Sequence, residues 1–274
     1  MGRLVLHIGM HKTGSSAIQH AFSRWRGVIG LSGVDYPMAR GPDGRRLPKH
    51  NDLFLAIAHE IDHGRAHPRL GSSRTRVERI AALVARKRCV LISAEGLSGT
   101  SPHYADACAP LATGEVRVVV CLRRAASWAP AFHAQMVRSR EVREVRPLGA
   151  WLEDEDVRAH LDLAGLLGRW ADVFGRERIV PVVWRAGQDI LPPFLEAADL
   201  PRWIARLPRA SRAGNPSPPP GWTDERRAAN AKARGLPWNP DRDVGDALHE
   251  IEAAQRAGLE RAGYGALAET LFGA

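Results

Sequence analysis

The stretch Leu4-Val5-Leu6-His7-Ile8-Gly9-Met10-His11-Lys12-Thr13-Gly14-Ser15-Ser16 decides the fold of this chain. Its apolar run Leu4–Ile8 is closed by Gly9 and predicts a buried strand. Ser15 or Ser16 then caps a predicted helix that continues to about Arg26, with its apolar residues on one face. A buried strand that leads through a Gly/Ser loop into a helix is typical of an α/β fold.

Further along the chain, apolar strand-length runs alternate with helical patterns. Later strands are predicted at Cys89–Ser93, Val116–Leu122 and Ile179–Trp184. Helices are predicted at Asn51–Glu60, Thr75–Lys87, Ser127–Arg138 and Leu161–Phe174. Because the strand runs lack a clear apolar/polar alternation, both of their faces are expected to be buried, as in parallel sheets. The sequence therefore predicts an α/β fold with a mostly parallel central sheet flanked by helices, and a ligand site at the carboxyl ends of the strands.

The carboxyl-terminal quarter of the sequence changes in character. Pro208 to Pro220, with Ser217-Pro218-Pro219-Pro220 at its centre, cannot form a regular helix or an inner strand. Beyond it, Thr223–Arg234 and Asp243–Leu271 predict two helices. We expect an α/β domain over residues 1–207, a crossing loop over residues 208–222, and a helical cap over residues 223–274 that packs on the same domain.

Composition excludes several classes of protein. The chain has 274 residues, of which 45% are hydrophobic and 25% charged, as in an ordinary globular protein rather than a disordered one. Its cysteines, Cys89, Cys108 and Cys121, match neither a disulfide framework nor a metal-binding spacing. No stretch approaches the roughly 18 apolar residues that a membrane helix needs, and the amino terminus does not resemble an export signal. We expect a cytoplasmic protein without an integral membrane segment.

The charge balance indicates an anionic ligand. Lys and Arg number 39 against 30 Asp and Glu, which gives a net charge of +9, and nearly all of the basic residues are arginines. Arginine favours planar recognition of phosphate, sulfate or carboxylate, although an arginine excess can also reflect codon bias. A nucleic-acid-binding protein is not expected, because no basic run alternates with aromatic residues and no recognition motif is present.

The loop from His7 to Ser16 has the features of an anion site. Backbone N–H groups at a helix amino terminus point outward without partners, and the helix dipole adds positive potential. Gly9 and Gly14 let the chain approach an anion closely, Ser15 and Ser16 add hydroxyl donors, and Lys12 adds a full charge. The loop is not a Walker A loop, because its lysine precedes the second glycine. A simple turn that caps a helix is the alternative, and a lysine inside the turn argues against it.

Lys12-Thr13-Gly14-Ser15-Ser16 resembles the 5′-phosphosulfate loop of sulfotransferases that use 3′-phosphoadenosine 5′-phosphosulfate (PAPS), and its surroundings resemble the bacterial members. Further segments resemble that family in the same order along the chain. They are Gly33-Val34-Asp35-Tyr36-Pro37, Lys49-His50-Asn51, Leu91–Leu97, Leu122-Arg123-Arg124, Trp170 with Phe174-Gly175, and Asn215-Pro216-Ser217. The resemblance implies a P-loop-like sulfotransferase fold, PAPS as co-substrate, and no metal.

The same resemblance assigns the residues that contact the nucleotide. Lys12, His11 and the residues Thr13, Gly14, Ser15 and Ser16 are expected to hold the 5′-phosphate, which is the leaving group of sulfuryl transfer. A second site is expected to hold the 3′-phosphate. In the family an arginine at a strand end works with a serine eight positions later; Arg123 matches the arginine, but Ala131 stands at the serine position. Ser127, one helical turn before Ala131, is the expected replacement, or else only a helix cap. Arg124 is expected to be solvated.

A general base is needed because the acceptor hydroxyl must lose its proton. Glu95 lies just past a predicted strand, and Ser93-Ala94-Glu95 resembles the family's Ser-x-Glu segment. A carboxylate at the start of a helix, or an ion pair with an arginine, is the structural alternative for Glu95. His50, which opens a predicted helix, is the second candidate base.

The sequence thus predicts a sulfotransferase acting on a hydroxyl or amine of a carbohydrate, lipid or small metabolite. A kinase-like phosphotransferase using ATP and Mg²⁺ is one alternative, although no Walker-B-like context follows Glu95. A catalytically inactive nucleotide-binding protein is another, because of Ala131. The acceptor, the residues that hold the adenine and the oligomeric state remain open.

Overall fold

The computed structural model describes residues 2–41, 43–208, 221–240 and 243–273. The chain divides into two compact units: residues 1–122 with 165–212, and residues 123–164 with 213–274. This division differs from the predicted boundary after residue 207, because residues 123–164 group with the carboxyl-terminal helices. Most of the predicted crossing loop, including Asn215-Pro216-Ser217, lies outside the described residues.

The first unit is built on a five-stranded sheet with the strand order β2-β5-β1-β6-β7. The strands are β1 (Arg3–His7), β2 (Val34–Asp35), β5 (Cys89–Ser93), β6 (Glu115–Leu122) and β7 (Ile179–Val183). All of its neighbouring pairs are parallel, which confirms the predicted fold class. β1 is the middle strand, so it is hydrogen-bonded along both edges.

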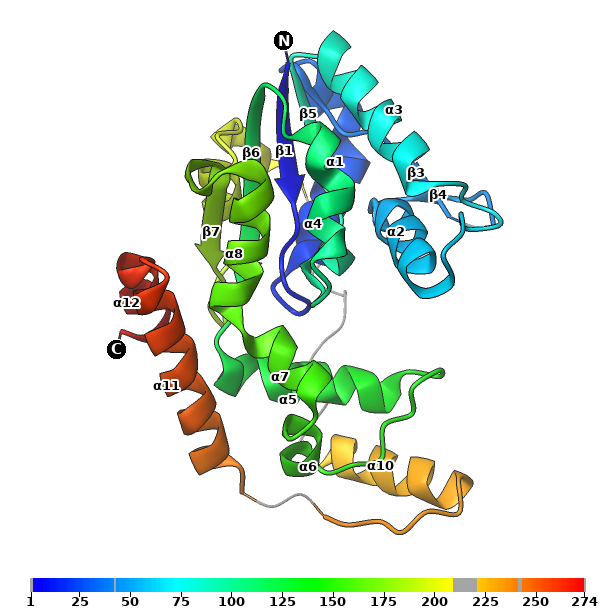
Figure 1. The fold of residues 1–274 in the computed structure, drawn as a ribbon, viewed down its shortest axis with the longest axis vertical. Helices are drawn as coiled ribbons and strands as arrows, with labels where there is room; N and C mark the ends of the chain where they lie inside the picture. Colours follow the sequence, from blue (N-terminus) through cyan, green and yellow to red (C-terminus); the bar gives the residue numbers. More distant parts are fainter. Residues whose placement is uncertain (1, 42, 209–220, 241–242, 274) are drawn as a thin grey trace. The chain divides into compact units, whose positions relative to one another are not determined.

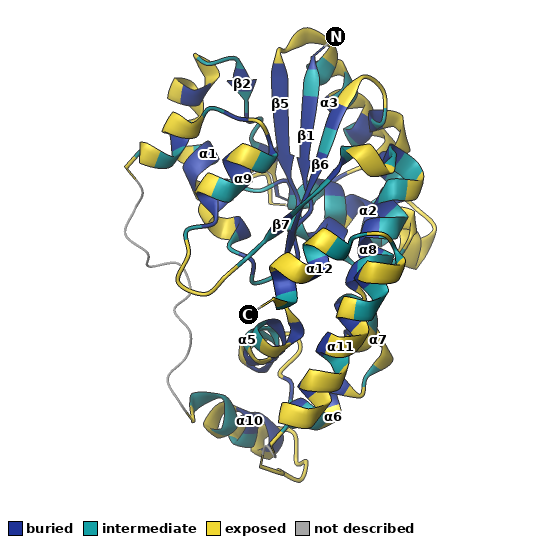
Figure 2. Cartoon of the chain, turned by 90° about the vertical axis from the view of Figure 1, so that its left-hand side faces the viewer, coloured by how far each residue is buried: buried dark blue, intermediate teal, exposed yellow. Residues whose placement is uncertain are grey.

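Helices cover both faces of this sheet, and so its inner strands are buried, as Figure 2 shows in dark blue. On one face, α1 (Ser15–Gly30) and α9 (Leu191–Ala197) pack their apolar residues against alternate residues of β1, β5 and β6. On the other face lie α3 (Ser73–Arg86) and α8 (Leu163–Phe174) (Figures 1 and 2). Burial on both faces explains why these strands are apolar throughout.

Several short elements complete the first unit, and the sequence pattern did not predict most of them. They are β3 (Ala39–Arg40), β4 (Arg46–Leu47), α2 (Asn51–His63), η1 (Glu95–Ser98), α4 (His103–Cys108), η2 (Ala109–Leu111), η3 (Arg176–Arg178) and η4 (Arg202–Arg206). Of these only α2 was expected. α1 extends beyond its predicted end at Arg26, with a kink at Trp25 where φ is −102° and ψ is 15°.

The second unit is helical. It comprises α5 (Ala125–Arg138), α6 (Leu148–Leu152), α7 (Glu155–Leu161), α10 (Trp222–Ala233), α11 (Gly245–Arg261) and α12 (Gly265–Phe272). The single helix predicted over Asp243–Leu271 is therefore two. Gly263 adopts a left-handed φ of 77°, and the Tyr264 N–H turns back to the Leu259 carbonyl at 2.7 Å, which ends α11.

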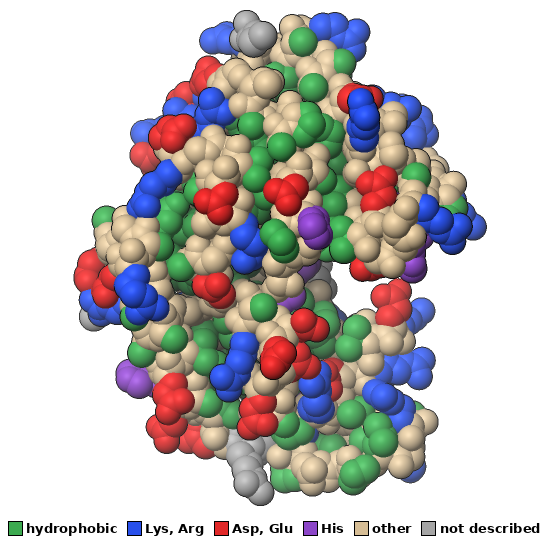
Figure 3. Space-filling model, viewed as in Figure 1, with side chains coloured by type: hydrophobic (Ala, Val, Ile, Leu, Met, Phe, Trp, Pro, Cys, Tyr) green, Lys and Arg blue, Asp and Glu red, His purple; other side chains and the backbone are tan. Residues whose placement is uncertain are grey.

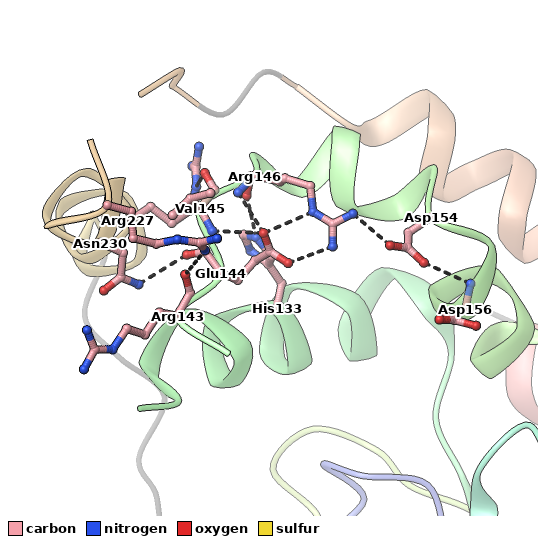
Figure 4. A network of polar contacts seen from close by, with 10 residues as sticks. His133, Arg143, Glu144, Val145, Arg146, Asp154, Asp156, Arg227 and Asn230 are labelled. Carbon is pink, nitrogen blue, oxygen red and sulfur yellow. Dashed lines mark hydrogen bonds and ion pairs between the residues drawn. The ribbon is translucent and has the colours of Figure 1, made fainter. Parts of the chain in front are cut away.

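Two buried polar side chains attach α10 to the connection between α5 and α6. Arg227 is fully buried, and its Nε donates to the Val145 carbonyl at 3.3 Å. The Asn230 amide donates to the Val137 carbonyl at 2.9 Å and to the Glu144 carbonyl at 3.2 Å. Figure 4 shows both side chains reaching from α10 to this connection. α10 thus supplies donors to carbonyl groups at the end of α5 and in the loop that follows it.

Charge is mixed on the surface. On the face drawn in Figure 3, Lys and Arg side chains alternate with Asp and Glu rather than forming one continuous basic area. Although the net charge of the chain is +9, this face therefore carries no concentrated basic patch.

Candidate anion-binding site

The loop between β1 and α1 is held against the neighbouring strand β6. The Ile8 N–H donates to the Val119 carbonyl at 3.1 Å, and the Met10 N–H donates to the Cys121 carbonyl at 2.9 Å. The Thr13 hydroxyl, which is fully buried, donates to the Met10 carbonyl at 2.6 Å and closes the turn from within. Thr13 therefore shapes the loop through its side chain, and only its backbone N–H remains as a donor for an anion.

Two left-handed residues give the loop its curvature. Gly14 has a φ of 83°, and Lys12 has a φ of 63°. For a residue with a Cβ atom this conformation costs about 1–2 kcal/mol. Strained residues of this kind concentrate at functional sites, where the surrounding structure enforces them. The conformation of Lys12 is thus an independent indication that the position of this side chain matters.

Gly14, rather than Ser15 or Ser16, is the N-cap of α1, which corrects the predicted cap. No side-chain cap bond is made at Gly14 among the described residues, and the first turn of the helix contains no acidic residue. A Cβ atom on Gly14 would lie 2.8 Å from Ile190 Cγ2, so the close packing at this position also requires glycine. An uncapped amino terminus offers unpartnered N–H groups and the positive end of the helix dipole to an anion.

The two serines differ in their surroundings. Ser16 is exposed, whereas Ser15 is 2% exposed and its hydroxyl has no hydrogen-bond partner among the described residues. A buried hydroxyl without a partner is unfavourable by about 1–3 kcal/mol. A ligand oxygen at the amino terminus of α1 would provide the missing partner for the Ser15 hydroxyl. His11 and Lys12 are half-buried beside this turn.

Glu95 begins η1 two residues after the end of β5. Because β1 and β5 are parallel neighbours, it lies at the same end of the strands as the loop. Its side chain is 14% exposed, and Oε1 lies 3.5 Å from the Lys49 ammonium. Both structural alternatives weighed for Glu95, a helix-start carboxylate and an ion pair, are thus present, although the pairing partner is a lysine. In either case the Glu95 carboxylate stays at the carboxyl ends of the strands, where a base is expected.

His50 is fixed by the backbone at both ring nitrogens. Its Nδ1 accepts from the Ser93 N–H at 3.0 Å, so its Nε2 carries the proton and donates to the Pro37 carbonyl at 2.5 Å. Burial lowers the pKa of His50 to about 4, which keeps the ring neutral near pH 7. With both nitrogens engaged, the ring has no lone pair to take the proton of an acceptor. This geometry suits a structural residue rather than the second candidate base.

Arg123 and Ser127, the two residues expected to contact the 3′-phosphate, are hydrogen-bonded to each other. Arg123 follows β6. Its Nε donates to the hydroxyl of Ser127, in the first turn of α5, at 3.0 Å. Burial lowers the pKa of Arg123 to about 10, so the guanidinium stays charged at neutral pH. Both side chains are half-buried. The pair therefore presents a fixed positive group with a hydroxyl beside it.

The amino terminus of α5 is already occupied by α11, which sequence reasoning missed. Glu252 accepts from the Ala126 N–H at 2.7 Å and from Arg124 in bidentate fashion at 2.9 and 2.6 Å. The Gln255 side-chain oxygen accepts from the Ala125 N–H at 3.3 Å. Arg124 is thus part of an ion pair, not only solvated as expected. Any anion bound by Arg123 and Ser127 must rely on their side chains.

The described residues offer neither a cluster of metal ligands nor a membrane-spanning helix. No group of three or more His, Cys, Asp or Glu side chains in this part of the chain is placed to hold a metal ion. None of its helices combines the length and the apolar character needed to span a membrane. A groove of about 810 Å³ in the second unit, lined by residues within 147–158 and 239–254, includes none of the predicted site residues.

Comparison with known proteins gives one structural match. No family model matches the sequence, and no curated protein matches it. Among solved structures, the crystal structure of a sulfotransferase from Alicyclobacillus acidocaldarius aligns with 97% of this chain and 95% of that chain. The TM-score is 0.49 and the sequence identity 17%. The chain is thus similar to a bacterial sulfotransferase in the course of its backbone over nearly its whole length.

Proposed function

We propose that this protein is a sulfotransferase that transfers a sulfuryl group from PAPS to a hydroxyl or amine of a carbohydrate, lipid or small metabolite. One observation carries the proposal: α1 begins three residues after Lys12 without a side-chain cap at Gly14, and its buried Ser15 hydroxyl has no partner among the described residues. The family-like segments in the same order along the sequence add support. Together these observations support a phosphate-bearing ligand at the carboxyl ends of the strands.

The reaction breaks one sulfur–oxygen bond and forms another. The sulfur leaves the bridging oxygen of the donor's 5′-phosphate and bonds to the acceptor oxygen or nitrogen, while the acceptor proton passes to a base. Negative charge grows on the 5′-phosphate as it departs. A protein accelerates such a loose transfer mainly by positioning the reactants and stabilising the departing charge.

In this scheme the loop holds the leaving phosphate. Lys12 supplies a positive charge, and the backbone N–H groups of Thr13 to Ser16 supply donors, with the Ser15 hydroxyl beside them. A donor directed at developing charge is worth about 3–4 kcal/mol of transition-state stabilisation. His11 is assigned a binding role in the same loop.

Glu95 is assigned as the base. It stands at the edge of the sheet from which the loop starts, and its pairing with Lys49 over 3.5 Å involves Oε1. His50 is not assigned this role, because both of its ring nitrogens bond the backbone.

For Arg123 and Ser127 we propose contact with the 3′-phosphate. A guanidinium beside a hydroxyl matches a phosphate dianion in charge and in donor geometry. Because Glu252 already accepts from the α5 backbone, this contact would come from the two side chains. The absence of serine at Ala131 is thereby compensated one helical turn earlier.

Calorimetric titration with 3′-phosphoadenosine 5′-phosphate tests the proposal. We expect binding in the presence of EDTA, and about 100-fold weaker binding by Lys12→Ala, which corresponds to the loss of one charged donor. Lys87→Ala is the matched control, since Lys87 lies at the opposite end of the sheet, after α3. Absence of heat at millimolar nucleotide would overturn the proposal, and a preference for ATP with Mg²⁺ would favour a phosphotransferase instead. A screen of acceptors with labelled PAPS would then identify the substrate class.

A further inference from the structure

A buried polar cluster lies beneath the loop, where β1 and β5 end. His7 is the last residue of β1, Ser93 is the last residue of β5, and the two are partners in the strand register. His7 Nδ1 lies 2.8 Å from the Ser93 hydroxyl, and the Gln19 amide of α1 donates to the same hydroxyl at 3.2 Å. His7 and Ser93 are fully buried and Gln19 is 2% exposed, so these bonds are shielded from water.

Ser93 also connects this cluster to the start of α2. Its N–H donates to His50 Nδ1 at 3.0 Å, and its carbonyl accepts from the His50 N–H at 2.8 Å. The segments that meet at Ser93 are the ones that carry the proposed site. The loop runs between His7 and Gln19, Glu95 follows Ser93 by two residues, and Lys49 precedes His50.

The His7 ring also supports the loop directly. A Cβ atom on Gly9 would lie 2.9 Å from His7 Nε2, so the loop backbone passes close to this edge of the ring. Nε2 has no hydrogen-bond partner among the described residues. Burial lowers the pKa of His7 to about 3, so the ring is neutral. An apolar side chain would fill this space without leaving a buried polar atom unpaired, so packing alone does not account for a histidine here.

We propose that His7 is a positioning residue whose hydrogen bond to Ser93 fixes the anion-binding loop relative to the end of β5, and hence to Glu95. The effect on the reaction rests on the proposed function, whereas the effect on the loop does not.

Two substitutions separate hydrogen bonding from packing. In His7→Asn the amide Nδ2 can take the place of the imidazole Nδ1, whereas His7→Leu fills the space without a hydrogen bond. Amide hydrogen exchange of residues 9–16 in the ligand-free protein is expected to be about tenfold faster in His7→Leu and near the parent rate in His7→Asn. A role in packing alone predicts the opposite order, with leucine closer to the parent.

Ser93→Ala provides a second variant that changes the volume little. It is expected to loosen the same loop amides and to weaken binding of 3′-phosphoadenosine 5′-phosphate by about tenfold. Ser73→Ala is the matched control, because the Ser73 hydroxyl also bonds a side chain, that of Glu60, but at the start of α3. If Ser93→Ala leaves loop exchange and nucleotide affinity as in Ser73→Ala, the inference is wrong.

Lys12→Ala, measured in parallel, distinguishes the two proposals. If Lys12→Ala binds the nucleotide as the parent does, the proposed function fails, and loop exchange in His7→Leu still decides whether His7 positions the loop. If Lys12→Ala loses binding while His7→Leu matches the parent in exchange and in affinity, the proposed function stands and the inference about His7 is refuted.

Discussion

A carboxylate that serves as a base must be placed firmly and still be reachable. The Glu95 side chain meets the first condition by starting η1 two residues after a buried strand, and its 14% exposure leaves access from solvent. The Lys49 ammonium, 3.5 Å away, holds the carboxylate in place from a side chain that is itself 38% exposed. An ion pair at this distance with a partly exposed lysine adds little to stability, so we expect it to serve mainly to orient the carboxylate.

Glu95→Gln keeps the shape of the side chain and removes its basicity. We expect nucleotide binding within about threefold of the parent and a transfer rate lower by about 10²–10⁴, the usual contribution of a general base. Titration calorimetry and a single-turnover assay with labelled PAPS would measure the two quantities. Glu177→Gln, which changes an exposed carboxylate in η3, is the control. A Glu95→Gln enzyme with the parent rate would remove Glu95 from the mechanism.

Single residues were predictable where the signal is local in sequence. The family-like segment singled out Arg123, and Ser127 was expected to replace the serine missing at Ala131; in the structure these two side chains are hydrogen-bonded. The contacts of Ser93 and Glu252 gave no such signal. Ser93 was noted only as part of a Ser-x-Glu segment, without its bonds to His7 and Gln19, and Glu252 contacts Arg124 across 128 positions of sequence.

At the scale of elements, a charged cluster orders the connection between α5 and α6. Glu144 is 7% exposed; its Oε1 accepts from the backbone N–H groups of Val145 and Arg146, each at 2.9 Å. Its Oε2 accepts from Arg146 at 2.8 Å, and Arg146 also bonds Asp154 at 2.8 Å (Figure 4). Burial by itself raises the pKa of Glu144, but the Arg146 side chain and the two backbone donors outweigh it, so the pKa is lowered.

This lowered pKa gives a pH dependence of known sign. The unfolded chain binds a proton at Glu144 near its ordinary pKa of 4.5, and the folded chain does so only at lower pH. The stabilisation by Glu144 is therefore complete above the ordinary value and is lost as the pH falls through the folded value. Glu144→Gln is expected to be about 1–3 kcal/mol less stable at pH 7, and the difference should shrink below pH 4.

Urea unfolding followed by circular dichroism at pH 7, 5 and 3.5 would measure this difference. Glu153→Gln, at a nearby exposed position, is the control and should follow the parent at every pH. A Glu144→Gln deficit that stays constant down to pH 3.5 would show that the carboxylate charge is not what stabilises the loop.

Elements were predictable in proportion to their length and burial. The strand expected at Cys89–Ser93 was placed correctly to the residue, because five apolar or small residues lie between turn signals. The strand at Val116–Leu122 was placed to within one residue. By contrast, β2, β3 and β4 have two residues each, too few to show a period. The break between α11 and α12 depends on the left-handed Gly263, within a sequence of otherwise continuous helical pattern.

At the scale of the molecule, the second unit is assembled from two distant parts of the chain. Glu252 caps α5, Gln255 donates to the Leu161 carbonyl at 2.8 Å, and Asn230 bonds the α5–α6 connection. Each of these bonds crosses more than 80 residues of sequence. The sequence predicted the carboxyl-terminal helices but not their partners, because helical periodicity shows which face is apolar and not what covers it.

A protein ended at residue 207 lacks all of these partners. We expect residues 123–164 to lose their fixed structure, because the α5 amino terminus and the Val137 carbonyl are left without hydrogen bonds. Limited proteolysis with mapping of the cleavage sites should show cutting within 123–164 at least about tenfold faster than in the full chain. Equal protection in the two proteins would mean that α5 to α7 are stable without the carboxyl-terminal helices.

The central place of β1 has a practical consequence for finding the ligand. The candidate anion-binding loop starts from the central strand of the sheet, so its binding-competent structure exists only while the first unit is folded. Any compound that binds the folded loop therefore increases the free energy of unfolding, by about 1.4 kcal/mol for each tenfold excess of its concentration over its dissociation constant. This stabilisation appears as a higher melting temperature. Candidate donors, their desulfated products and simple oxyanions can be ranked by scanning calorimetry before any acceptor is known.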